Sequence, residues 1–385
     1  MTLNHIYIGH VLDVLKDFPD KKIQSCITSP PYWSLRSYKS PLVIWDAEEG
    51  CEHKWIDATY IRNNDMTAGE IQRTNVGSVS RDEPVNNAFC LHCSAWRGEL
   101  GLEPHPQLYL QHLWQIFEEV MRVLKDDGCL FVVINDTYCG GKSGNTSDPH
   151  KTGVHRPNEC KFKKPALNDK HWLQPKQRLM IPERFAIGMQ ERGYILRNNI
   201  IWWKRNHMPS SAQDRFTNSY EHVYFFTKKR KYYFDLDAVR EPILESSINR
   251  INFSLKKNET YGINTNIKYE AVNFSPQATF MRNGRKAIHT TVDINNGKNP
   301  GDLWDITTVS YPGAHYATFP PKLPERCILC STKEGDIVLD PFAGSGTTCM
   351  VAYNLQRKYI GIDIQEEYIK QQYKRLGQLN VLSEV

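Results

Sequence analysis

The sequence of 385 residues lacks the long hydrophobic run that a membrane span requires. Its longest apolar run extends from Cys129 to Ile134, far short of the roughly 18 residues of a transmembrane helix. The first residues contain no basic segment followed by an apolar one, so no secretory signal is evident. We therefore expect a cytoplasmic protein without a membrane partner.

Extremes of composition are also missing. Hydrophobic residues make up 40% and charged residues 24%, as in ordinary globular domains, which excludes disordered, collagen-like and fibrous classes. The net charge of +5 is too small to identify a partner. Basic residues gather within residues 155–178 and 228–231, and the second run precedes three aromatic residues. Such clusters suit phosphate contact and base stacking, although a solvated charged surface explains them equally well.

Ten cysteines in a chain without a secretory signal indicate thiols or metal ligands rather than a disulfide framework. Cys51 and His53 share one irregular stretch with Cys90 and Cys93. Cys-x-x-Cys is the usual half of a tetrahedral zinc site, and Cys-x-His can form the other half. We predict a structural zinc site here; the alternative is four ordinary loop residues. The second close pair, within residues 327–330, lies in an expected helix and is interpreted as core packing.

Hydrophobic periodicity predicts alternating strands and helices. We expect strands at residues 6–8, 23–27, 129–134, 194–202, 223–227, 337–339 and 359–362, and helices at 108–124, 182–191, 324–331, 347–355 and from 366. This alternation predicts an α/β fold with a doubly wound, mostly parallel sheet covered on both faces. Residues 40–100, 139–176 and 240–310 lack clean periodicity and are interpreted as polar insertions.

A glycine-rich turn follows the predicted strand that ends at Asp340. Glycines at 344 and 346 allow close approach of a ligand to the backbone, and the next helix offers free N–H groups. No lysine follows Gly346, so the turn is not a Walker A loop. Cys349 stands where a dinucleotide fingerprint needs a third glycine. A nucleoside-type ligand remains, with Asp363 as acceptor for ribose hydroxyls, and a purely structural turn is the alternative.

A proline-rich turn follows the second predicted strand, at Ser29-Pro30-Pro31-Tyr32. Two adjacent prolines forbid a helix, and their carbonyl groups face no local competing N–H donor. A rigid acceptor beside an aromatic ring suits an extruded base with an exocyclic amino group. The alternative is a turn that merely ends a strand.

Taken together, the two turns resemble those of amino-methylating DNA methyltransferases that use S-adenosylmethionine, in the permuted β arrangement. That family carries a (Asp/Asn/Ser)-Pro-Pro-(Tyr/Phe) motif first and a Phe-x-Gly-x-Gly motif last, and residues 29–32 and 342–346 stand in this order. The resemblance extends to residues 201–204 and 318–321. It implies a Rossmann-like methyltransferase sheet assembled from both chain ends.

The resemblance also implies site residues. Ser29, Pro30, Pro31 and Tyr32 would be catalytic, with Tyr32 stacked on the flipped base. The residues expected to bind the cofactor are His10, Thr28, Phe319, Pro320, Asp340, Pro341, Phe342, Gly344, Gly346, Thr347 and Asp363. One departure concerns His10, because the family often has aspartate at that position to hold the adenine ring; Asp13 lies one helical turn further on.

The expected reaction is direct methyl transfer to an exocyclic amine in duplex DNA. The absence of a Pro-Cys dipeptide argues against methylation at ring carbon 5, which needs a cysteine nucleophile. In this family a leading serine is associated mainly with cytosine N4, whereas aspartate or asparagine is associated with adenine N6. Cytosine N4 is thus favoured and adenine N6 is the alternative. An RNA or small-molecule methyltransferase and a non-catalytic nucleic-acid-binding protein are the remaining alternatives.

The predicted domain organisation follows from these motifs. Residues 1–39, 101–239 and 311–385 would form the catalytic domain, residues 40–100 an insertion with the zinc site, and residues 240–310 the target-recognition region. A cognate restriction endonuclease is a possible partner of such a methyltransferase.

Overall fold

The computed structural model describes residues 1–35, 37–57, 88–139, 176–243, 279–282, 285–288, 297–308 and 319–377. Most of the basic cluster at 155–178, most of the predicted recognition region and residue 318 lie outside this part of the chain. Within it, no helix is long and apolar enough to cross a bilayer.

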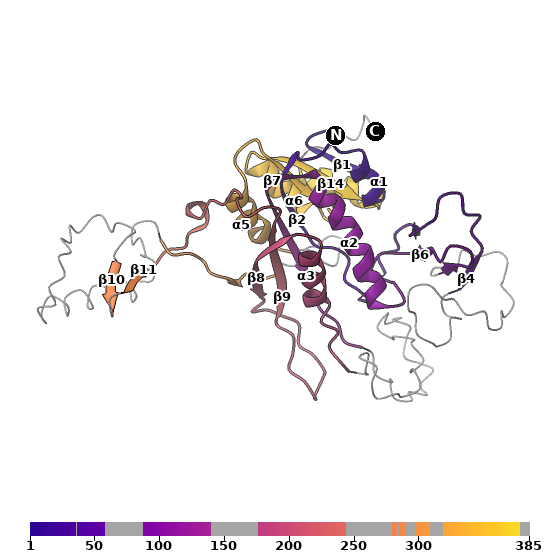
Figure 1. Cartoon of the computed structure of the whole chain (residues 1–385), viewed down its shortest axis with the longest axis horizontal. Helices are drawn as coiled ribbons and strands as arrows, with labels where there is room; N and C mark the ends of the chain where they lie inside the picture. Colours follow the sequence, from indigo (N-terminus) through magenta and orange to yellow (C-terminus); the bar gives the residue numbers. More distant parts are fainter. Residues whose placement is uncertain are drawn as a thin grey trace, which may run out of the picture.

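The elements alternate along the chain as the periodicity predicts (Figure 1). They are β1 (His5–Ile8), α1 (Val11–Lys16), β2 (Ile23–Thr28), β3 (Val43–Trp45), β4 (Trp55–Asp57), β5 (Ala88–Cys90), β6 (Trp96–Gly98), α2 (Pro106–Val123), β7 (Leu124–Ile134), α3 (Ile181–Glu191), β8 (Ile195–Trp203), β9 (Tyr220–Thr227), η2 (Asp237–Val239), β10 (Thr279–Arg282), β11 (Arg285–Ile288), β12 (Leu303–Asp305), α5 (Lys322–Ser331), β13 (Ile337–Asp340), α6 (Thr347–Asn354), β14 (Lys358–Asp363) and α7 (Glu366–Arg375).

The largest sheet has eight strands in the order β1-β14-β13-β2-β7-β9-β8-β12. Every neighbouring pair is parallel except the two that involve β9, so β9 alone runs opposite to the other seven strands. Strand β2 from the N-terminal part pairs with β13 from the C-terminal part. This pairing confirms a mostly parallel sheet assembled from both chain ends.

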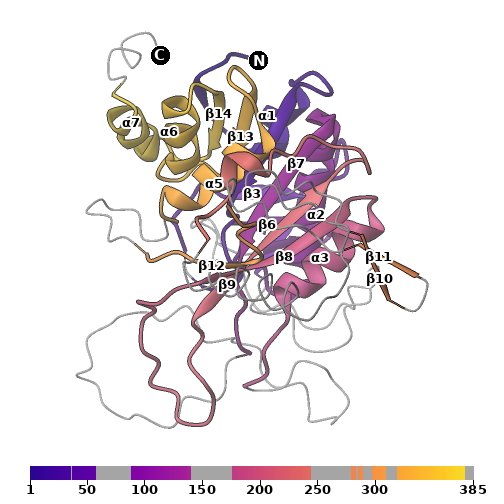
Figure 2. The same ribbon diagram turned by 90° about the vertical axis from the view of Figure 1, so that its left-hand side faces the viewer.

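Helices cover both faces of this sheet, and Figure 2 shows α2 and α3 on one side with α5, α6 and α7 on the other. Strand β7 explains why both faces are apolar. Its side chains alternate between the two hydrophobic cores: Leu130, Val132 and Ile134 join the core of α1, α2 and α3, whereas the residues between them join the core of α5, α6 and α7. A strand buried on both faces reads as one continuous apolar run, which is the pattern of residues 129–134.

Helix α2 begins at a well-formed cap and is held by its apolar face. Nδ1 of His105 accepts a hydrogen bond of 3.0 Å from the backbone N–H of Gln107, and Pro106 occupies the first turn, where its missing N–H costs nothing. Leu110, Leu113 and residues further along the same face are fully buried. The cap and the buried face therefore fix α2 in the core beside the sheet.

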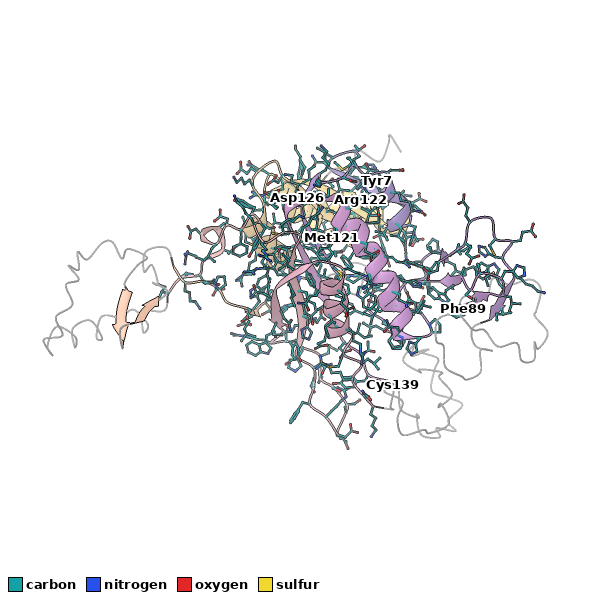
Figure 3. All side chains as sticks on the ribbon, viewed as in Figure 1. Tyr7, Phe89, Met121, Arg122, Asp126 and Cys139 are labelled. Atoms are coloured by element: carbon teal, nitrogen blue, oxygen red, sulfur yellow. The ribbon has the colours of Figure 1, made fainter. Side chains whose placement is uncertain are left out.

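A second sheet was not anticipated within residues 40–100. It has four strands of three residues each, in the order β3-β6-β5-β4. Every pair of neighbouring strands is antiparallel. Phe89, labelled in Figure 3, belongs to this sheet, which lies on the side of the molecule away from β10 and β11. Trp45, Phe89 and Trp96 join the core beneath α2, so the small sheet is attached to the main body.

Strand β12 is a second feature that the periodicity did not indicate. It extends the large sheet by pairing with β8 in parallel, with Trp304 opposite Trp202. Residues 303–305 of the predicted recognition region thus belong to the same sheet as the two motifs.

Candidate active site

The carboxyl edge of the large sheet collects polar residues from six strands. Because seven strands are parallel, the residues that end β1, β2, β7, β8, β13 and β14 all meet at this edge. A cavity of about 670 Å³ opens there, within the range typical of small-molecule sites. Among its lining residues are His10, Ser29, Pro30, Pro31, Tyr32, Phe319, Asp340, Pro341, Phe342, Gly344, Thr347 and Asp363.

The structure therefore brings the two motifs of the sequence into one cavity. Of the predicted site residues, Thr28, Pro320 and Gly346 do not line it. Thr28 is buried behind the cavity wall, and its hydroxyl donates a 2.6 Å hydrogen bond to Oδ1 of Asp340, which lines the cavity. Gly346 caps α6 with φ of 72°, a left-handed conformation that favours glycine. Pro320 accepts the N–H of Leu323 at the start of α5.

The turn after β2 is fixed from below. The hydroxyl of Tyr109 on α2 donates to the carbonyl of Pro31 at 2.7 Å. Gly101 has φ of 91°, and a Cβ there would lie 3.3 Å from the carbonyl oxygen of Tyr32, so only glycine allows this close approach. No described residue donates to the Pro30 carbonyl. The turn thus holds one rigid acceptor, at Pro30, that is free for a ligand.

Tyr32 is the centre of a polar network at the cavity wall. Its hydroxyl donates to Oε2 of Glu221 at 2.8 Å and accepts from the Ser29 hydroxyl at 3.2 Å. Glu221 is 8% exposed and forms an ion pair with Lys204. Burial, followed by the nearby charge of Glu221, raises the pKa of Tyr32 well above its ordinary value. The phenol therefore remains protonated at neutral pH and acts as a hydrogen-bond donor.

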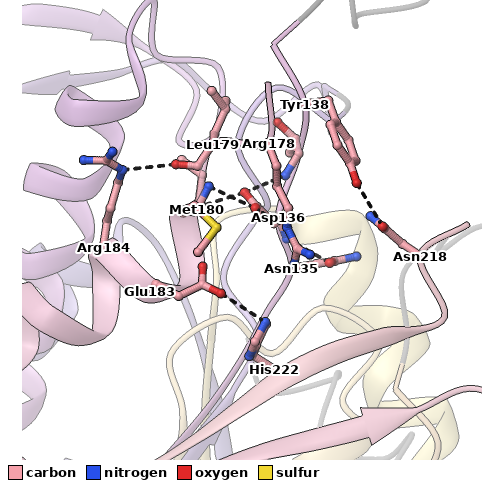
Figure 4. Close-up of polar contacts among 12 residues, drawn as sticks. Asn135, Asp136, Tyr138, Arg178, Leu179, Met180, Glu183, Arg184, Asn218 and His222 are labelled. Carbon is pink, nitrogen blue, oxygen red and sulfur yellow. Dashed lines mark hydrogen bonds and ion pairs between the residues drawn. The ribbon is translucent and has the colours of Figure 1, made fainter. Parts of the chain in front are cut away.

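The end of β7 completes this network (Figure 4). Asp136 is 6% exposed and accepts hydrogen bonds from Arg178 Nε at 2.7 Å and from the backbone N–H of Met180 at 2.9 Å. These bonds tie the start of α3 to the sheet edge. The preceding residue, Asn135, lines the cavity and donates to Glu221 Oε1 at 3.4 Å.

Sequence reasoning missed Glu221, Lys204 and Asn135 as site residues. A signal was present for two of them, because Asn135 follows the apolar run of β7 and Lys204 follows the apolar end of β8. Glu221 lies within β9, near its start, and gave no such signal. All three line the cavity. In a mostly parallel sheet, polar residues at such positions face the ligand-binding edge.

The glycine turn after β13 is organised by two carboxyl groups, the buried Asp340 and the partly buried Asp363. Asp340 Oδ1 accepts the N–H of Phe342 at 3.1 Å in addition to the Thr28 hydroxyl. Asp363 accepts the N–H of Gly344 at 2.8 Å. Burial raises the pKa of both Asp340 and Asp363 to about 6, although these hydrogen bonds favour the ionised form. Both groups are thus mostly ionised at neutral pH and sensitive to mild acid.

The small sheet supplies the opposite wall. Trp45 lines the cavity, stacks on His112 with ring centroids 4.3 Å apart and meets His10 edge-on at 4.7 Å. Burial disfavours the charged form of His112, but its hydrogen bonds with Asp46 and Glu103 outweigh burial and raise its pKa. These hydrogen bonds hold the His112 ring on α2, and Trp45 stacks against that ring.

Two ring nitrogens at this wall have no partner among the described residues. Nε2 of His10 and Nε1 of Trp45 are both buried and unpaired, and both residues line the cavity. Buried polar atoms normally find partners, so these two suit a polar ligand. Asp13, the alternative for an adenine contact, is 71% exposed at its side chain and does not line the cavity; it pairs with His10 at 3.8 Å.

The predicted metal ligands come together elsewhere, at the end of the small sheet. The ligand atoms of Cys51, His53, Cys90 and Cys93 all lie within 4.8 Å of one another. None of the four lines the cavity. Cys327 and Cys330 are buried on α5 among apolar residues, where core packing was expected.

The sheet with the proline turn and the glycine turn at one edge has the arrangement expected of an amino-methylating DNA methyltransferase, and comparison with known proteins identifies the family. Residues 23–374 match the N6_N4_Mtase family of DNA methylases, and the chain belongs to this family. It is 30% identical over 371 residues to Type II methyltransferase M.Cfr9I of Citrobacter freundii, covering 96% of this chain and 87% of that protein. It is also 30% identical over 364 residues to M.SmaI of Serratia marcescens, covering 94% and 87%.

Among solved structures, the fold resembles that of PvuII DNA methyltransferase (cytosine-N4-specific), with a TM-score of 0.52 and 18% identity over 97% of this chain and 86% of that one. The predictions of an amino-methylating DNA methyltransferase, of its Rossmann-like α/β sheet and of S-adenosylmethionine as methyl donor are confirmed.

Proposed function

We propose that this DNA methylase transfers a methyl group to the exocyclic N4 of a cytosine that is flipped out of duplex DNA. The observation that carries the proposal is the single cavity shared by Ser29–Tyr32 and by Asp340–Asp363. Methyl transfer requires donor and acceptor to meet, and one cavity with both motifs on its wall satisfies that requirement. Two observations favour cytosine over adenine. The first motif begins with serine, and the PvuII enzyme of similar fold is described as cytosine-N4-specific.

The proposed acceptors for the amino protons are the Ser29 hydroxyl and the Pro30 carbonyl. The Pro30 oxygen has no donor among the described residues, and the turn that carries it is held rigid by Tyr109 and Gly101. Accepting both protons would help the amine nitrogen become tetrahedral and direct its lone pair toward the methyl group. Because the acceptors are already in place, little reorganisation is needed during the reaction.

Tyr32 has two proposed roles. Its ring would stack on the flipped base, as base-flipping enzymes use aromatic faces, while its hydroxyl is held by Glu221. The ion pair with Lys204 orients the Glu221 carboxylate. We assign Glu221 and Lys204 as positioning residues for Tyr32 and for the base.

S-adenosylmethionine, when bound, supplies an electrophilic methyl group on a sulfonium. Asp340 and the turn that includes Pro341, Phe342, Gly344, Gly346 and Thr347 would hold the donor, with Phe319 beside it, while Thr28 and Pro320 would support this wall from below. Asp363 is proposed to accept ribose hydroxyls. His10 and Trp45 would meet the adenine, because their unpaired ring nitrogens lie at the wall next to Asp363, whose carbonyl accepts the N–H of Gly9.

Duplex DNA would approach the open side of the cavity. The segment between β8 and β9 carries Arg205 and Arg215 with the strongly exposed side chains of Met208 and Phe216, and Met208 also lines the cavity. Cations beside exposed apolar groups suit contact with phosphates and bases.

The domain assignment stays a proposal, with residues 240–310 as the recognition region and residues 40–100 as an insertion. A restriction endonuclease is the proposed system partner, and the cytoplasm is the proposed location.

Transfer of tritium from labelled S-adenosylmethionine tests the substrate class. The purified chain should label duplex DNA and leave RNA and small amines unlabelled. Label in RNA or small amines alone would contradict the proposal. Single-molecule sequencing of the methylated plasmid would then give the modified base and its sequence context together.

A further inference from the structure

We infer that Cys51, His53, Cys90 and Cys93 bind one structural Zn²⁺ ion that clamps the small sheet against the wall of the cavity. Three soft thiolates with one imidazole are the donor set that selects zinc among the common divalent metals. The four residues come from two separate parts of the chain, which the fold brings within ligand distance. This site lies outside the methyl-transfer machinery described above.

Two of the distances between ligand atoms match those of a tetrahedral ion. A tetrahedral site with Zn–S bonds of about 2.3 Å places its sulfur atoms about 3.8 Å apart and each sulfur about 3.5 Å from an imidazole nitrogen. The Sγ atoms of Cys51 and Cys90 are 3.8 Å apart, and Sγ of Cys93 lies 3.4 Å from Nδ1 of His53. A disulfide between Cys51 and Cys90 would require about 2.05 Å, so these thiols are placed for a shared ion rather than for a bond.

The backbone around Cys90 supports a bound thiolate. The N–H of His92 points at Sγ of Cys90 at 3.3 Å, and the N–H of Ser94 donates to the Cys90 carbonyl at 3.1 Å. Ser94 has φ of 62°, which closes the chain tightly between Cys90 and Cys93. An N–H directed at sulfur stabilises the thiolate that a zinc ion needs and orients it as outer contacts do in metal sites.

The position of the site explains what the ion would stabilise. Cys51 and His53 precede β4, whereas Cys90 ends β5 and Cys93 lies in the turn before β6. Strands of three residues are too short to be stable by pairing alone. An ion that joins these two chain segments would cross-link positions about 40 residues apart in sequence, and cross-links over long stretches restrict the unfolded chain most.

The clamp also reaches the cavity. The strand β3 pairs with β6, and β3 ends at Trp45, which lines the cavity and stacks on His112. Four protein ligands leave no open position for chemistry, so the proposed role of the ion is structural. Its loss should disturb Trp45, the proposed adenine contact, and leave the proline turn and the glycine turn in place.

Metal analysis of the full chain, purified without chelator, tests this inference. We expect one zinc ion per chain, and a chain that holds no zinc and takes up none on addition would overturn the inference. The double variant Cys90→Ser with Cys93→Ser should lose the ion. The matched control is Cys327→Ala with Cys330→Ala, which has the same spacing in the buried helix α5 and should retain it. Zinc retained in the first variant, or lost in the control, would contradict the assignment.

Replacement of the ion by Co²⁺ in the unmutated chain gives a second readout that does not depend on a variant folding. A tetrahedral site with three thiolates should show intense visible d–d bands and sulfur-to-cobalt charge transfer in the near ultraviolet. Weak octahedral bands without charge transfer would overturn the ligand set. Detection of a Cys51–Cys90 disulfide in place of bound metal would do the same.

Discussion

The hydroxyl of Thr28 donates a hydrogen bond of 2.6 Å to Oδ1 of Asp340, although 312 positions separate the two residues. The bond crosses the junction of β2 and β13, the strands that carry the proline turn and the glycine turn. It ties the proposed acceptor half of the cavity to the proposed donor half, so a change at Thr28 should reach both.

Thr28→Val keeps the shape of this buried side chain and removes the donor. Loss of a hydrogen bond to a buried carboxylate costs about 1–3 kcal/mol, so we expect a lower free energy of unfolding and about tenfold weaker binding of S-adenosylmethionine. Denaturant unfolding and calorimetric titration would measure the two effects. The control Thr227→Val removes another buried hydroxyl, far from the cavity, and should cost stability without changing cofactor affinity. Equal cofactor affinity in both variants would contradict the proposed link.

Ser29→Ala tests the proposed acceptor for the amino proton. The turnover number should fall by about 10²-fold, the scale seen when one preorganised polar contact is removed, while the dissociation constant for S-adenosylmethionine stays unchanged. Single-turnover methylation and cofactor titration would separate the two quantities. Ser25→Ala is the matched control, because Ser25 lies in β2, the strand that Ser29 follows, and its hydroxyl accepts a hydrogen bond from Ser331 in the core. Full turnover by Ser29→Ala would refute the assigned role.

Glu221→Gln preserves the size of the side chain and removes the charge that holds Lys204. We expect the turnover number to fall by about 10-fold to 10²-fold with little change in the KM for S-adenosylmethionine, because the carboxylate orients Tyr32 and does not face the donor. Glu183→Gln neutralises a carboxylate that contacts His222 outside the cavity and serves as control. If both variants lost turnover equally, Glu221 would be a structural residue only.

Cofactor affinity should depend on pH in mild acid. Burial raises the pKa of Asp340 and Asp363 to about 6 in the free protein. The proposed contacts with ribose and with the glycine turn require ionised carboxylates, so protons compete with the cofactor as the pH falls through 6. We predict that the dissociation constant rises toward tenfold per pH unit below 6 for each required carboxylate and is flat above 7. Asp363→Asn should bind more weakly at pH 7 and show a shallower dependence. A dissociation constant that is independent of pH between 5 and 7 would contradict these roles.

The main fold was predictable because its core strands contain runs of apolar residues that are contiguous in the sequence, so each strand can be recognised from its own residues. The run from Cys129 to Ile134 is buried on both faces, and the turns at Pro30 and Gly344 mark the ends of strands that meet at one edge. Resemblance to a known family then supplied the order of the motifs. The assignment of individual site residues remains a prediction.

Other features depend on contacts between distant residues and left no local pattern. The small sheet has strands of only three residues, too short for alternation to be visible, and pairs Trp55 with Cys90 across a long segment. Glu221 interrupts an apolar strand, and its partners Tyr32 and Lys204 come from two other strand ends. In the sequence alone, a charged residue within an apolar run argues against a strand at that place. In the fold, the partners of Glu221 make its burial stable.

Identification of the methylated base is the most direct test of the proposed function. Duplex DNA methylated by the purified chain can be digested to nucleosides and analysed by mass spectrometry, with authentic N4-methyldeoxycytidine, N6-methyldeoxyadenosine and 5-methyldeoxycytidine as standards. The leading serine of the first motif predicts N4-methyldeoxycytidine as the product, and the place of Ser29 at the shared cavity predicts that Ser29→Ala forms it about 10²-fold more slowly. N6-methyldeoxyadenosine would contradict the choice of base, and 5-methyldeoxycytidine or no modified nucleoside would contradict amino methylation itself.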